Sequence, residues 1–479
     1  MKVDVRETGV GDAAAEIVAV GLCEGDELPS ELADARGAAD VKAAFKKVTL
    51  IHPEDPERVL VVGLGARADL DAERARVASA VAAREAGKLG ARSMAWLVPE
   101  AEDREAIAAG LTVGSILAGF RFDRFRKPDA EDEQPPSIES LVLIGPADLA
   151  QEVEFARVSA EAQNRARELQ ELPANIATPS FLAQRATEIA DGSESLSIEV
   201  LGREEISEKG MGGLEAVSQG TVEEPKLIVL RRTAGEGPTL GIVGKGVTFD
   251  TGGISLKPSA SMQEMKMDMS GAAAVLEAVA AIDELEIPLN LIAVVPTTEN
   301  MPSGTATRPG DVITQYNGKT VEVNNTDAEG RLILADALAY CAELGADRLI
   351  DIATLTGAVI IALGSTYAAL ISNDDTLSEE IEQAAGETGE LAWRLPLHPE
   401  FKELTKGTIA DLTNAAAKRK AGTIYAGSFL EEFVDGRPWA HLDVAGTSWD
   451  VGREYVGKGA SGYGVRLLVE LARRHAEPR

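Results

Sequence analysis

The stretch Leu240-Gly241-Ile242-Val243-Gly244-Lys245-Gly246 is the clearest indication of the fold of this chain. Its apolar part has the length and composition of a strand that is buried on both faces of a parallel sheet. Glycines then end the strand in a loop, and Lys245 and Asp250 come just past its carboxyl end. Open α/β sheets bind their ligands at that edge. The stretch therefore predicts an α/β fold with a ligand site at the strand ends.

Similar apolar runs recur on both sides of this stretch and indicate two α/β domains. The chain has 479 residues, of which 45% are hydrophobic. A chain of this length usually forms more than one domain, each with its own hydrophobic core. The runs alternate with alanine-rich helical stretches. They are Ile17 to Gly21, Val59 to Val62, Met94 to Val98, Leu141 to Ile144, Leu227 to Leu230, Leu291 to Val295 and Leu349 to Ile352. We expect a smaller N-terminal α/β domain over residues 1–150, a linking helix over 151–172 and a larger C-terminal α/β domain over 173–479.

A polar cluster further along, Asn325-Thr326-Asp327-Ala328-Glu329-Gly330-Arg331, holds two carboxylates and a guanidinium. If Val321 to Asn325 is a strand that runs into an extended turn, the side chains of Asp327 and Glu329 project to one side. Neighbouring hard oxygen ligands are what divalent cations require, and Arg331 could hold an anion against the same metal. An isolated pair of acids with this spacing is more often a solvated turn, so the prediction depends on a second cluster.

That second cluster begins at Lys245 and ends at Asp268. It offers two amines, Lys245 and Lys257, and two carboxylates, Asp250 and Asp268, on a scaffold rich in glycine. Asp268 comes directly before an alanine-rich helical run, so we expect its carboxylate near a helix start. Either cluster alone would be unremarkable, but together they favour a site for one or two divalent cations.

These blocks resemble those of the leucyl aminopeptidases, cytosolic exopeptidases that use two metal ions. The blocks that carry the resemblance are GKGVTFD at 244–250, ISLKP at 254–258, NTDAEGR at 325–331, DIATLTG at 351–357 and WAHLDVAG at 439–446. They cover roughly residues 172–470. Thr251 departs from the family, which usually has serine there, but it keeps the hydroxyl group. The resemblance implies that the C-terminal domain is catalytic and has a central mixed sheet flanked by helices.

Carried over residue by residue, the resemblance implies a role for each site residue. The metal ligands would be Lys245, Asp250, Asp268, Asp327 and Glu329. Asp250 and Glu329 would be shared between the two ions, and Lys245 could bind only as the neutral amine. The catalytic pair would be Lys257 and Arg331. The pocket for the first side chain of the substrate would include Met265, Thr354, Leu355, Gly357 and Ala445.

The implied reaction is the release of N-terminal residues, with leucine and other hydrophobic residues preferred, from peptides with a free amino terminus. A water that bridges two Zn²⁺ or Mn²⁺ ions would be acidic enough to attack the peptide carbonyl. Lys257 would stabilise the oxyanion that forms. Arg331 stays protonated and cannot act as a base, and the resemblance gives it a bicarbonate ion to hold. The family also implies a homohexamer.

Two alternatives stay open at this point. Another two-metal hydrolase, such as a phosphatase, would use the same ligands. A regulatory DNA-binding role is known for some members of the family, but the net charge of -31 would repel a phosphate backbone. Nucleic acid is therefore not an expected partner. Adaptation to a salt-rich cytoplasm would also explain this excess of acidic residues.

Other chemistries lack the residues that they need. The chain has four histidines and no H-E-x-x-H pair, which disfavours a histidine-based zinc site. It also has no G-x-S-x-G sequence, the nucleophile motif of α/β hydrolases. The amino end is polar and does not resemble a signal peptide, and the most apolar stretch, Ala358 to Ile371, is too short to span a bilayer. We expect a cytoplasmic protein with no membrane partner.

Overall fold

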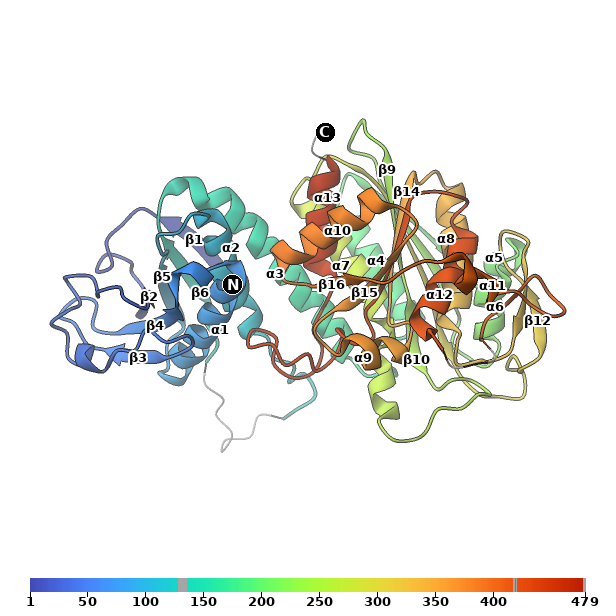
Figure 1. The fold of residues 1–479 in the computed structure, drawn as a ribbon, viewed down its shortest axis with the longest axis horizontal. Coiled ribbons are helices and arrows are strands. Elements are labelled where there is room, and N and C mark those ends of the chain that lie inside the picture. Colours follow the sequence, from blue (N-terminus) through green and yellow to red (C-terminus); the bar gives the residue numbers. More distant parts are fainter. Residues whose placement is uncertain (128–135, 417, 419, 477–479) are drawn as a thin grey trace. The chain divides into compact units, whose positions relative to one another are not determined.

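The computed structural model describes residues 1–127, 136–416, 418 and 420–476, which form two compact units (Figure 1). The first unit comprises Met1–Asn164 together with Gly452–Gly457, and the second comprises Arg165–Val451 and Lys458–Arg479. The division falls within helix α3 (Ala150–Glu171).

The first unit is built on a six-stranded sheet in the order β1-β6-β5-β2-β4-β3. Its strands are β1 (Lys2–Arg6), β2 (Ile17–Cys23), β3 (Val48–Ile51), β4 (Val59–Gly65), β5 (Ser93–Leu97) and β6 (Ser140–Ile144). Only β3 runs antiparallel to its neighbour. The strands β2 and β4 are almost wholly buried, as their unbroken apolar runs predict.

Two helices of the first unit, α1 (Ala72–Lys88) and α2 (Arg104–Ala118), pack against each other on this sheet. Each begins at an aspartate, Asp71 or Asp103, whose side chain accepts a hydrogen bond from a backbone N–H of the first turn. Gly114 allows the close approach of the helices, because a Cβ atom there would lie 2.0 Å from the carbonyl oxygen of Arg76.

The segment Gly452–Gly457 belongs to the first unit although it lies near the carboxyl end of the chain. Tyr455 is buried, and its hydroxyl lies 3.1 Å from both carboxylate oxygens of Glu73 on α1. Arg453 also donates to Glu73, at 3.2 Å. The first unit is therefore made from two stretches that are far apart in the sequence.

The second unit contains a nine-stranded mixed sheet in the order β16-β15-β18-β14-β9-β11-β8-β7, with β10 paired to β11. The strands are β7 (Leu196–Leu201), β8 (Lys226–Arg232), β9 (Thr239–Gly244), β10 (Gly246–Asp250), β11 (Asn290–Asn300), β14 (Arg348–Ala353), β15 (Ala368–Ser372), β16 (Ala392–Arg394) and β18 (Trp439–Asp443). The neighbours β18, β14, β9 and β11 are parallel. This sheet confirms the expected α/β class and its mixed central sheet.

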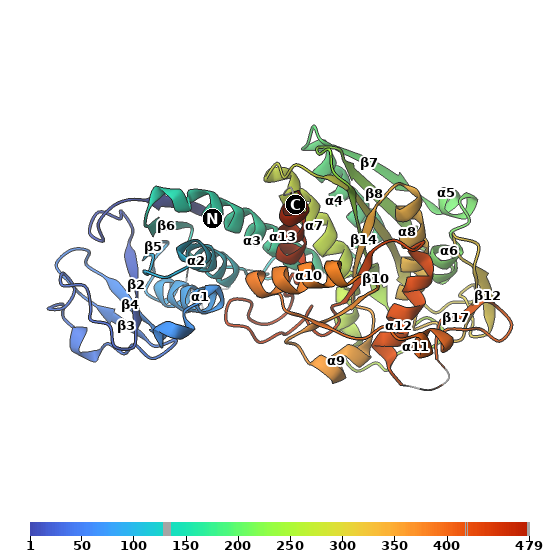
Figure 2. The ribbon, with the colours of Figure 1, turned by 45° about the horizontal axis from the view of Figure 1, so that its top comes forward.

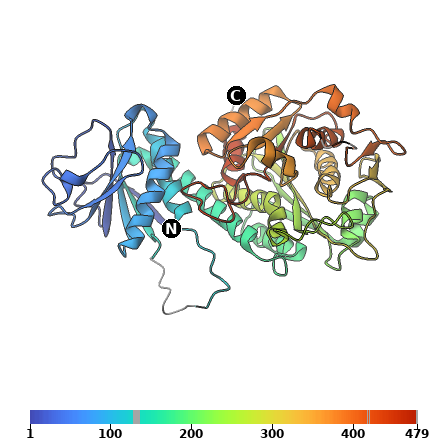
Figure 3. The same cartoon turned by 60° about the horizontal axis from the view of Figure 1, so that its bottom comes forward.

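Helices cover both faces of the large sheet (Figure 2; Figure 3). One layer holds α4 (Pro179–Asp191), α7 (Ser270–Glu284), α10 (Asp375–Thr388) and α13 (Val465–Ala476). The other layer holds α6 (Gly212–Ser218), α8 (Gly330–Glu343) and α12 (Gly422–Leu430). Two glycines of β9 show which helix lies on each face of the sheet. A Cβ atom on Gly241 would meet Cys341 of α8, and one on Gly244 would meet Gly271 of α7.

The remaining elements are short. A three-stranded sheet is formed by β12 (Asp311–Thr314), β13 (Thr320–Val323) and β17 (Leu412–Thr413). Short helices are α5 (Arg203–Glu208), α9 (Gly357–Leu363), α11 (Pro399–Glu403) and the 3-10 turns η1 (Ala38–Asp40), η2 (Arg67–Asp69), η3 (Ala147–Leu149), η4 (Met262–Met269) and η5 (Glu431–Phe433). Within the described residues, no helix is both long enough and apolar enough to cross a membrane.

One buried ion cluster joins α4 and α7 to the end of α3 that belongs to the second unit. Glu277 of α7 has a fully buried side chain. Its Oε1 accepts from Arg185 Nε at 2.7 Å, and its Oε2 accepts from Arg185 and from Arg165 Nε, at 2.9 and 2.7 Å. Both carboxylate oxygens are therefore paired with guanidinium groups that reach out from α3 and α4.

Candidate active site

The five predicted metal ligands come together where β9, β10 and β14 end and α7 and α8 begin. Lys245 joins β9 to β10, and Asp250 is the last residue of β10. Asp268 lies in η4 just before α7, and Asp327 and Glu329 directly precede α8. The cluster thus lies at the carboxyl edge of the parallel strands, where α/β sheets bind their ligands.

Lys245 is at the centre of one half of the cluster. Its Nζ lies 2.7 Å from Asp268 Oδ2 and 2.8 Å from Glu329 Oε1, and it donates to the carbonyl oxygen of Thr354 at 3.0 Å. Only 2% of the lysine side chain is exposed, so these partners replace its contact with water. Burial alone would lower the pKa of Lys245, but the charges of Asp268 and Glu329 outweigh that effect and raise it.

Lys257 is at the centre of the other half. Its Nζ lies 2.7 Å from Asp250 Oδ2 and 2.5 Å from Asp327 Oδ1. About a quarter of its side chain is exposed, 23%, so it lies at the open side of the cluster. A cationic group in that place can reach a molecule that enters from solvent.

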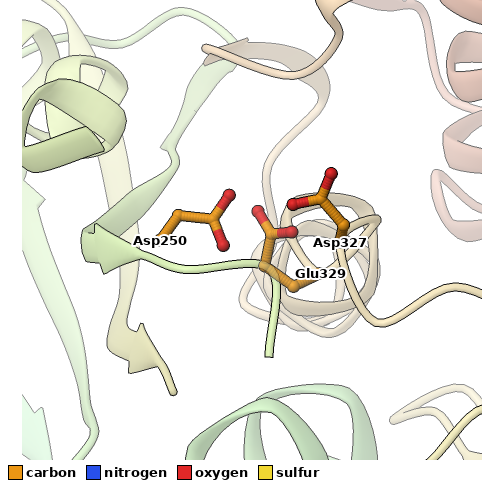
Figure 4. A group of neighbouring side chains, drawn as sticks. All are labelled: Asp250, Asp327 and Glu329. Carbon is orange, nitrogen blue, oxygen red and sulfur yellow. The ribbon is translucent and has the colours of Figure 1, made fainter. Parts of the chain in front are cut away.

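Three of the carboxylates point toward one another, as Figure 4 shows for Asp250, Asp327 and Glu329. One oxygen of each lies within 4.8 Å of the others. Four carboxylates, counting Asp268, share the cluster with only two ammonium groups. Such an excess of negative charge favours the binding of a divalent cation.

The residues fit a divalent cation in two further respects. Glu329 Oε2 is buried and accepts no hydrogen bond from the residues that the structure describes. The pKa values of Asp250 and Asp268 are raised, mainly by burial and further by the neighbouring carboxylates. A cation would bind the unpaired oxygen and relieve this repulsion, and it would displace the proton of Lys245, since only a neutral amine binds metal.

Two glycines make this packing possible. A Cβ atom on Gly330 would lie 2.6 Å from Lys245 Cε, so any side chain there would push the lysine away. Gly252 has a φ of +87°, in the region that favours glycine, and a Cβ atom there would lie 2.8 Å from Asp327 Oδ1. The glycines of both sequence clusters therefore have steric reasons to be there.

The strand expected over Val321 to Asn325 is shorter in the structure, where β13 ends at Val323. The backbone N–H groups of Asn324 and Asn325 donate to Asn414 Oδ1, at 2.8 and 3.2 Å, and not to a strand partner. The chain then turns, and Glu329 has helical φ and ψ angles as the cap of α8. Asp327 and Glu329 meet through this turn, so the extended geometry that we expected was wrong although the two carboxylates are neighbours.

Two asparagines that the sequence did not single out hold the acidic residues in place. Asn300 Nδ2 donates to Asp250 Oδ1 at 2.8 Å and to the carbonyl oxygen of Thr326 at 3.0 Å. Asn414 Nδ2 donates to the carbonyl oxygen of Asn325 at 2.7 Å. Asn414 follows the two-residue strand β17 in a polar stretch, and no periodicity or motif there marks it.

Arg331 lies beside the cluster on the first turn of α8. Its side chain donates to the carbonyl oxygen of Asn414 at 2.7 Å and lies over the ring of Tyr425, 5.5 Å from the centroid. Burial lowers its pKa, while Tyr425 and Glu329 act in the opposite direction. Within the described part of the chain, Arg331 Nε has no hydrogen-bond partner. This buried cation could hold a small anion.

The predicted pocket residues surround the same edge. Thr354 Oγ1 donates to Asp268 Oδ1 at 2.7 Å, which joins the end of β14 to the cluster. The backbone N–H groups of Leu355 and Ala445 both donate to Asp443, at 3.1 and 3.3 Å. The other two predicted positions are Met265, which lies in η4 near Asp268, and Gly357, which begins α9.

Comparisons with known proteins agree with this geometry. The family model described as "Cytosol aminopeptidase family, catalytic domain" matches residues 164–469, and the one described as "Cytosol aminopeptidase family, N-terminal domain" matches residues 26–129. The probable cytosol aminopeptidase of Roseiflexus castenholzii is 43% identical over 486 residues, which cover 99% of each chain. That of Alkaliphilus oremlandii is 38% identical over 500 residues, with the same coverage.

The solved structure of the bottromycin maturation enzyme BotP in complex with Mn has a TM-score of 0.88 to this chain. The two are 34% identical, and the match covers 97% of this chain and 100% of the other. The matches therefore extend through both units, and the carboxylates of Asp250, Asp327 and Glu329 lie where the catalytic family model matches. This chain is a metal-dependent aminopeptidase that belongs to the cytosol aminopeptidase family.

Proposed function

We propose that this aminopeptidase releases single N-terminal residues from peptides, with leucine and other hydrophobic residues preferred, at a centre of two divalent cations. The observation that carries the proposal is the convergence of Asp250, Asp327 and Glu329, with one oxygen of each within 4.8 Å of the others. Lys245 and Asp268 complete the set of ligands. Asp250 and Glu329 would be the shared ligands in this proposal. Glu329 is paired with Lys245 and Asp250 with Lys257, yet one oxygen of each lies within 4.8 Å of the other.

The cations, when bound, supply an acidified bridging water as the nucleophile and a positive charge for the peptide carbonyl. The side chains of the protein do the rest. Lys257 lies at the open side of the cluster, where its ammonium group can stabilise the oxyanion of the tetrahedral intermediate. Arg331 would hold a small anion, for which we propose bicarbonate. Such an anion would take the proton of the attacking water and pass it to the leaving amine, because the guanidinium stays protonated and can do neither.

The first side chain of the substrate lies, in this proposal, against Met265, Thr354, Leu355, Gly357 and Ala445. The preference for a hydrophobic residue rests on their mostly apolar side chains. For the metal, carboxylates and an amine accept Zn²⁺ and Mn²⁺ alike. The complex of the similar enzyme BotP with Mn supports manganese as the first ion to test.

Three further proposals follow from membership of the family. We propose a homohexamer and a cytoplasmic location. We propose residues 173–479 as the catalytic domain, since every site residue lies there. Residues 1–150 would be the N-terminal domain, and residues 151–172 the linking helix, all but the last of which lie in α3.

The proposal is tested with chelated enzyme and two matched substrates, a leucyl dipeptide and its N-acetylated form. Chelation should abolish cleavage of the free dipeptide, and either Mn²⁺ or Zn²⁺ should restore it. The acetylated form should remain uncut, because its blocked amine cannot bind. Equal cleavage of the two forms would contradict the exopeptidase assignment. A phosphate ester added to the same panel tests the phosphatase alternative, which predicts its hydrolysis at a comparable rate.

A further inference from the structure

We propose that Asp443 is a positioning residue that fixes the wall of the substrate pocket relative to the metal ligands. The proposal rests on the function proposed above. Asp443 is the last residue of β18 and is fully buried. Within the described residues, its carboxylate is hydrogen-bonded to the two loops that follow β14 and β18 and not to Lys257 or a metal ligand, so it would act through the backbone that it holds.

The carboxylate of Asp443 joins two loops that leave neighbouring strands. Its Oδ1 accepts from the backbone N–H groups of Leu355, Thr356 and Ala445, at 3.1, 3.3 and 3.3 Å. Its Oδ2 accepts from the hydroxyl of Thr356 at 2.6 Å. Leu355 and Thr356 follow β14, whereas Ala445 follows β18. The carboxylate thus fixes two of the pocket positions, Leu355 and Ala445, relative to each other.

The same loop reaches the metal ligands one residue earlier. Thr354 donates its hydroxyl to Asp268 and accepts from Lys245 through its carbonyl oxygen. Leu355, the next residue, is held by Asp443. A shift of the loop would therefore move the pocket wall and Thr354 together, and small displacements of this kind can slow a reaction considerably.

Burial of a carboxylate is unfavourable, so the surroundings of Asp443 must hold it in this position. Burial raises the pKa of Asp443, while the neighbouring His441 and the hydrogen bond from Thr356 act against that rise. The surroundings are also fixed, because His441 Nδ1 lies 2.6 Å from Asp351 and the hydroxyl of Thr356 lies 2.8 Å from that of Thr423 on α12. A buried carboxylate that satisfies three backbone N–H groups cannot be replaced by an apolar residue without leaving them unpaired.

The test compares Asp443→Ala with Asp443→Asn in the full-length, metal-loaded enzyme. Asparagine keeps an acceptor oxygen for the three N–H groups, and its amide can donate to Thr356. Asp443→Ala should raise KM for a leucyl dipeptide about tenfold, the order expected when buried N–H groups lose their acceptor, and it should reduce the preference for leucine over alanine as the first residue. Asp443→Asn should stay within about threefold of the parent enzyme, a margin that corresponds to one neutral hydrogen bond.

Hydrogen exchange provides a reading that is independent of turnover. Peptides that cover residues 354–358 and 444–448 should exchange faster in Asp443→Ala and at the parent rate in Asp443→Asn. Metal content should be unchanged in both variants. Asp336→Ala is the matched control, because Asp336 is also fully buried and accepts from backbone N–H groups, those of Leu214 and Tyr316. It should lower stability without changing substrate preference.

Each outcome decides the question. Unchanged KM, preference and exchange in Asp443→Ala would refute the proposal, and so would equal losses in the alanine and asparagine variants. If Asp443→Ala does not fold, Thr356→Val replaces it, because it removes the 2.6 Å bond and should weaken the preference in the same direction. If the parent enzyme cleaves no free dipeptide, the proposed function fails, while the exchange rates still report on whether Asp443 holds the two loops.

Discussion

Two clusters of charged side chains in the second unit, one around Glu277 and one around Glu329, differ in whether their charges are balanced. Around Glu277, one carboxylate meets two guanidinium groups, and both of its oxygens are paired. Around Glu329, four carboxylates meet two ammonium groups, and Glu329 Oε2 has no hydrogen-bond partner in the described residues. Both glutamates are almost fully buried.

The comparison shows that burial of a charge is not by itself a sign of function. Arg185 also lies 3.7 Å from Glu188, so two carboxylates balance the two guanidinium groups of the Glu277 cluster. The Glu329 cluster has more carboxylates than ammonium groups, and a bound cation would balance this excess. An excess of charge, together with a ligand atom that has no hydrogen-bond partner, is therefore a better indication of a catalytic site than burial of charge alone.

The strongest test of the difference is a matched pair of substitutions, and Glu329→Gln should have the largest effect. The amide keeps the shape of the side chain but loses a charged metal ligand. We expect turnover of a leucyl dipeptide to fall by more than about a thousandfold, together with the metal content by elemental analysis. Parent-like turnover in this variant would mean that Glu329 is structural, as Glu277 is.

Lys257→Ala sharpens the comparison within the catalytic cluster, because it removes a cation and not a ligand. We expect kcat to fall roughly 10²- to 10³-fold, the loss typical of one oxyanion donor. Metal content should stay at the parent value, which separates this variant from Glu329→Gln. A loss of metal with Lys257→Ala would show that the lysine instead holds Asp250 and Asp327 in place.

Arg331→Ala should have a milder effect, since the arginine only positions an anion. We expect kcat to fall roughly 10- to 100-fold, and added bicarbonate should stimulate the parent enzyme more than the variant. Arg331→Lys offers a control that keeps the charge without the planar group. Equal stimulation of the parent enzyme and Arg331→Ala by bicarbonate would contradict the anion site.

Glu277→Gln should have the smallest effect on catalysis and a clear one on stability. Removing one partner of a buried ion pair typically costs about 3 kcal/mol, here at the lower end because Arg165 and Arg185 remain partly exposed. The melting temperature should fall, while turnover and metal content measured well below it should match the parent. A loss of metal in this variant would break the distinction between the two clusters.

Much of the fold could be predicted from the sequence, because the central strands are continuous apolar runs. The strands β9 and β14 lie where the runs Leu240 to Val243 and Leu349 to Ile352 indicated. The edges of the sheets were harder to predict. The edge strands β7 and β16 have several exposed residues, and β16 has only three residues, so neither forms a continuous apolar run.

The site divides in the same way. The proposed metal ligands lie in short motifs that contain several charged residues. The asparagines that hold them in place come from distant parts of the sequence. Asn300 lies 50 residues from Asp250, and Asn414 lies 89 residues from Asn325. No local spacing links such pairs. Asn414 also accounts for the early end of β13, because its side chain accepts from the N–H groups of Asn324 and Asn325 in place of a strand partner.

The segment Gly452–Gly457 has a consequence for synthesis of the protein. It supplies Tyr455, which is 1% exposed, to a unit whose other residues all lie before position 165. During translation, the hydroxyl of Tyr455 can reach Glu73 only after the ribosome has added residue 455, 382 residues after Glu73 itself.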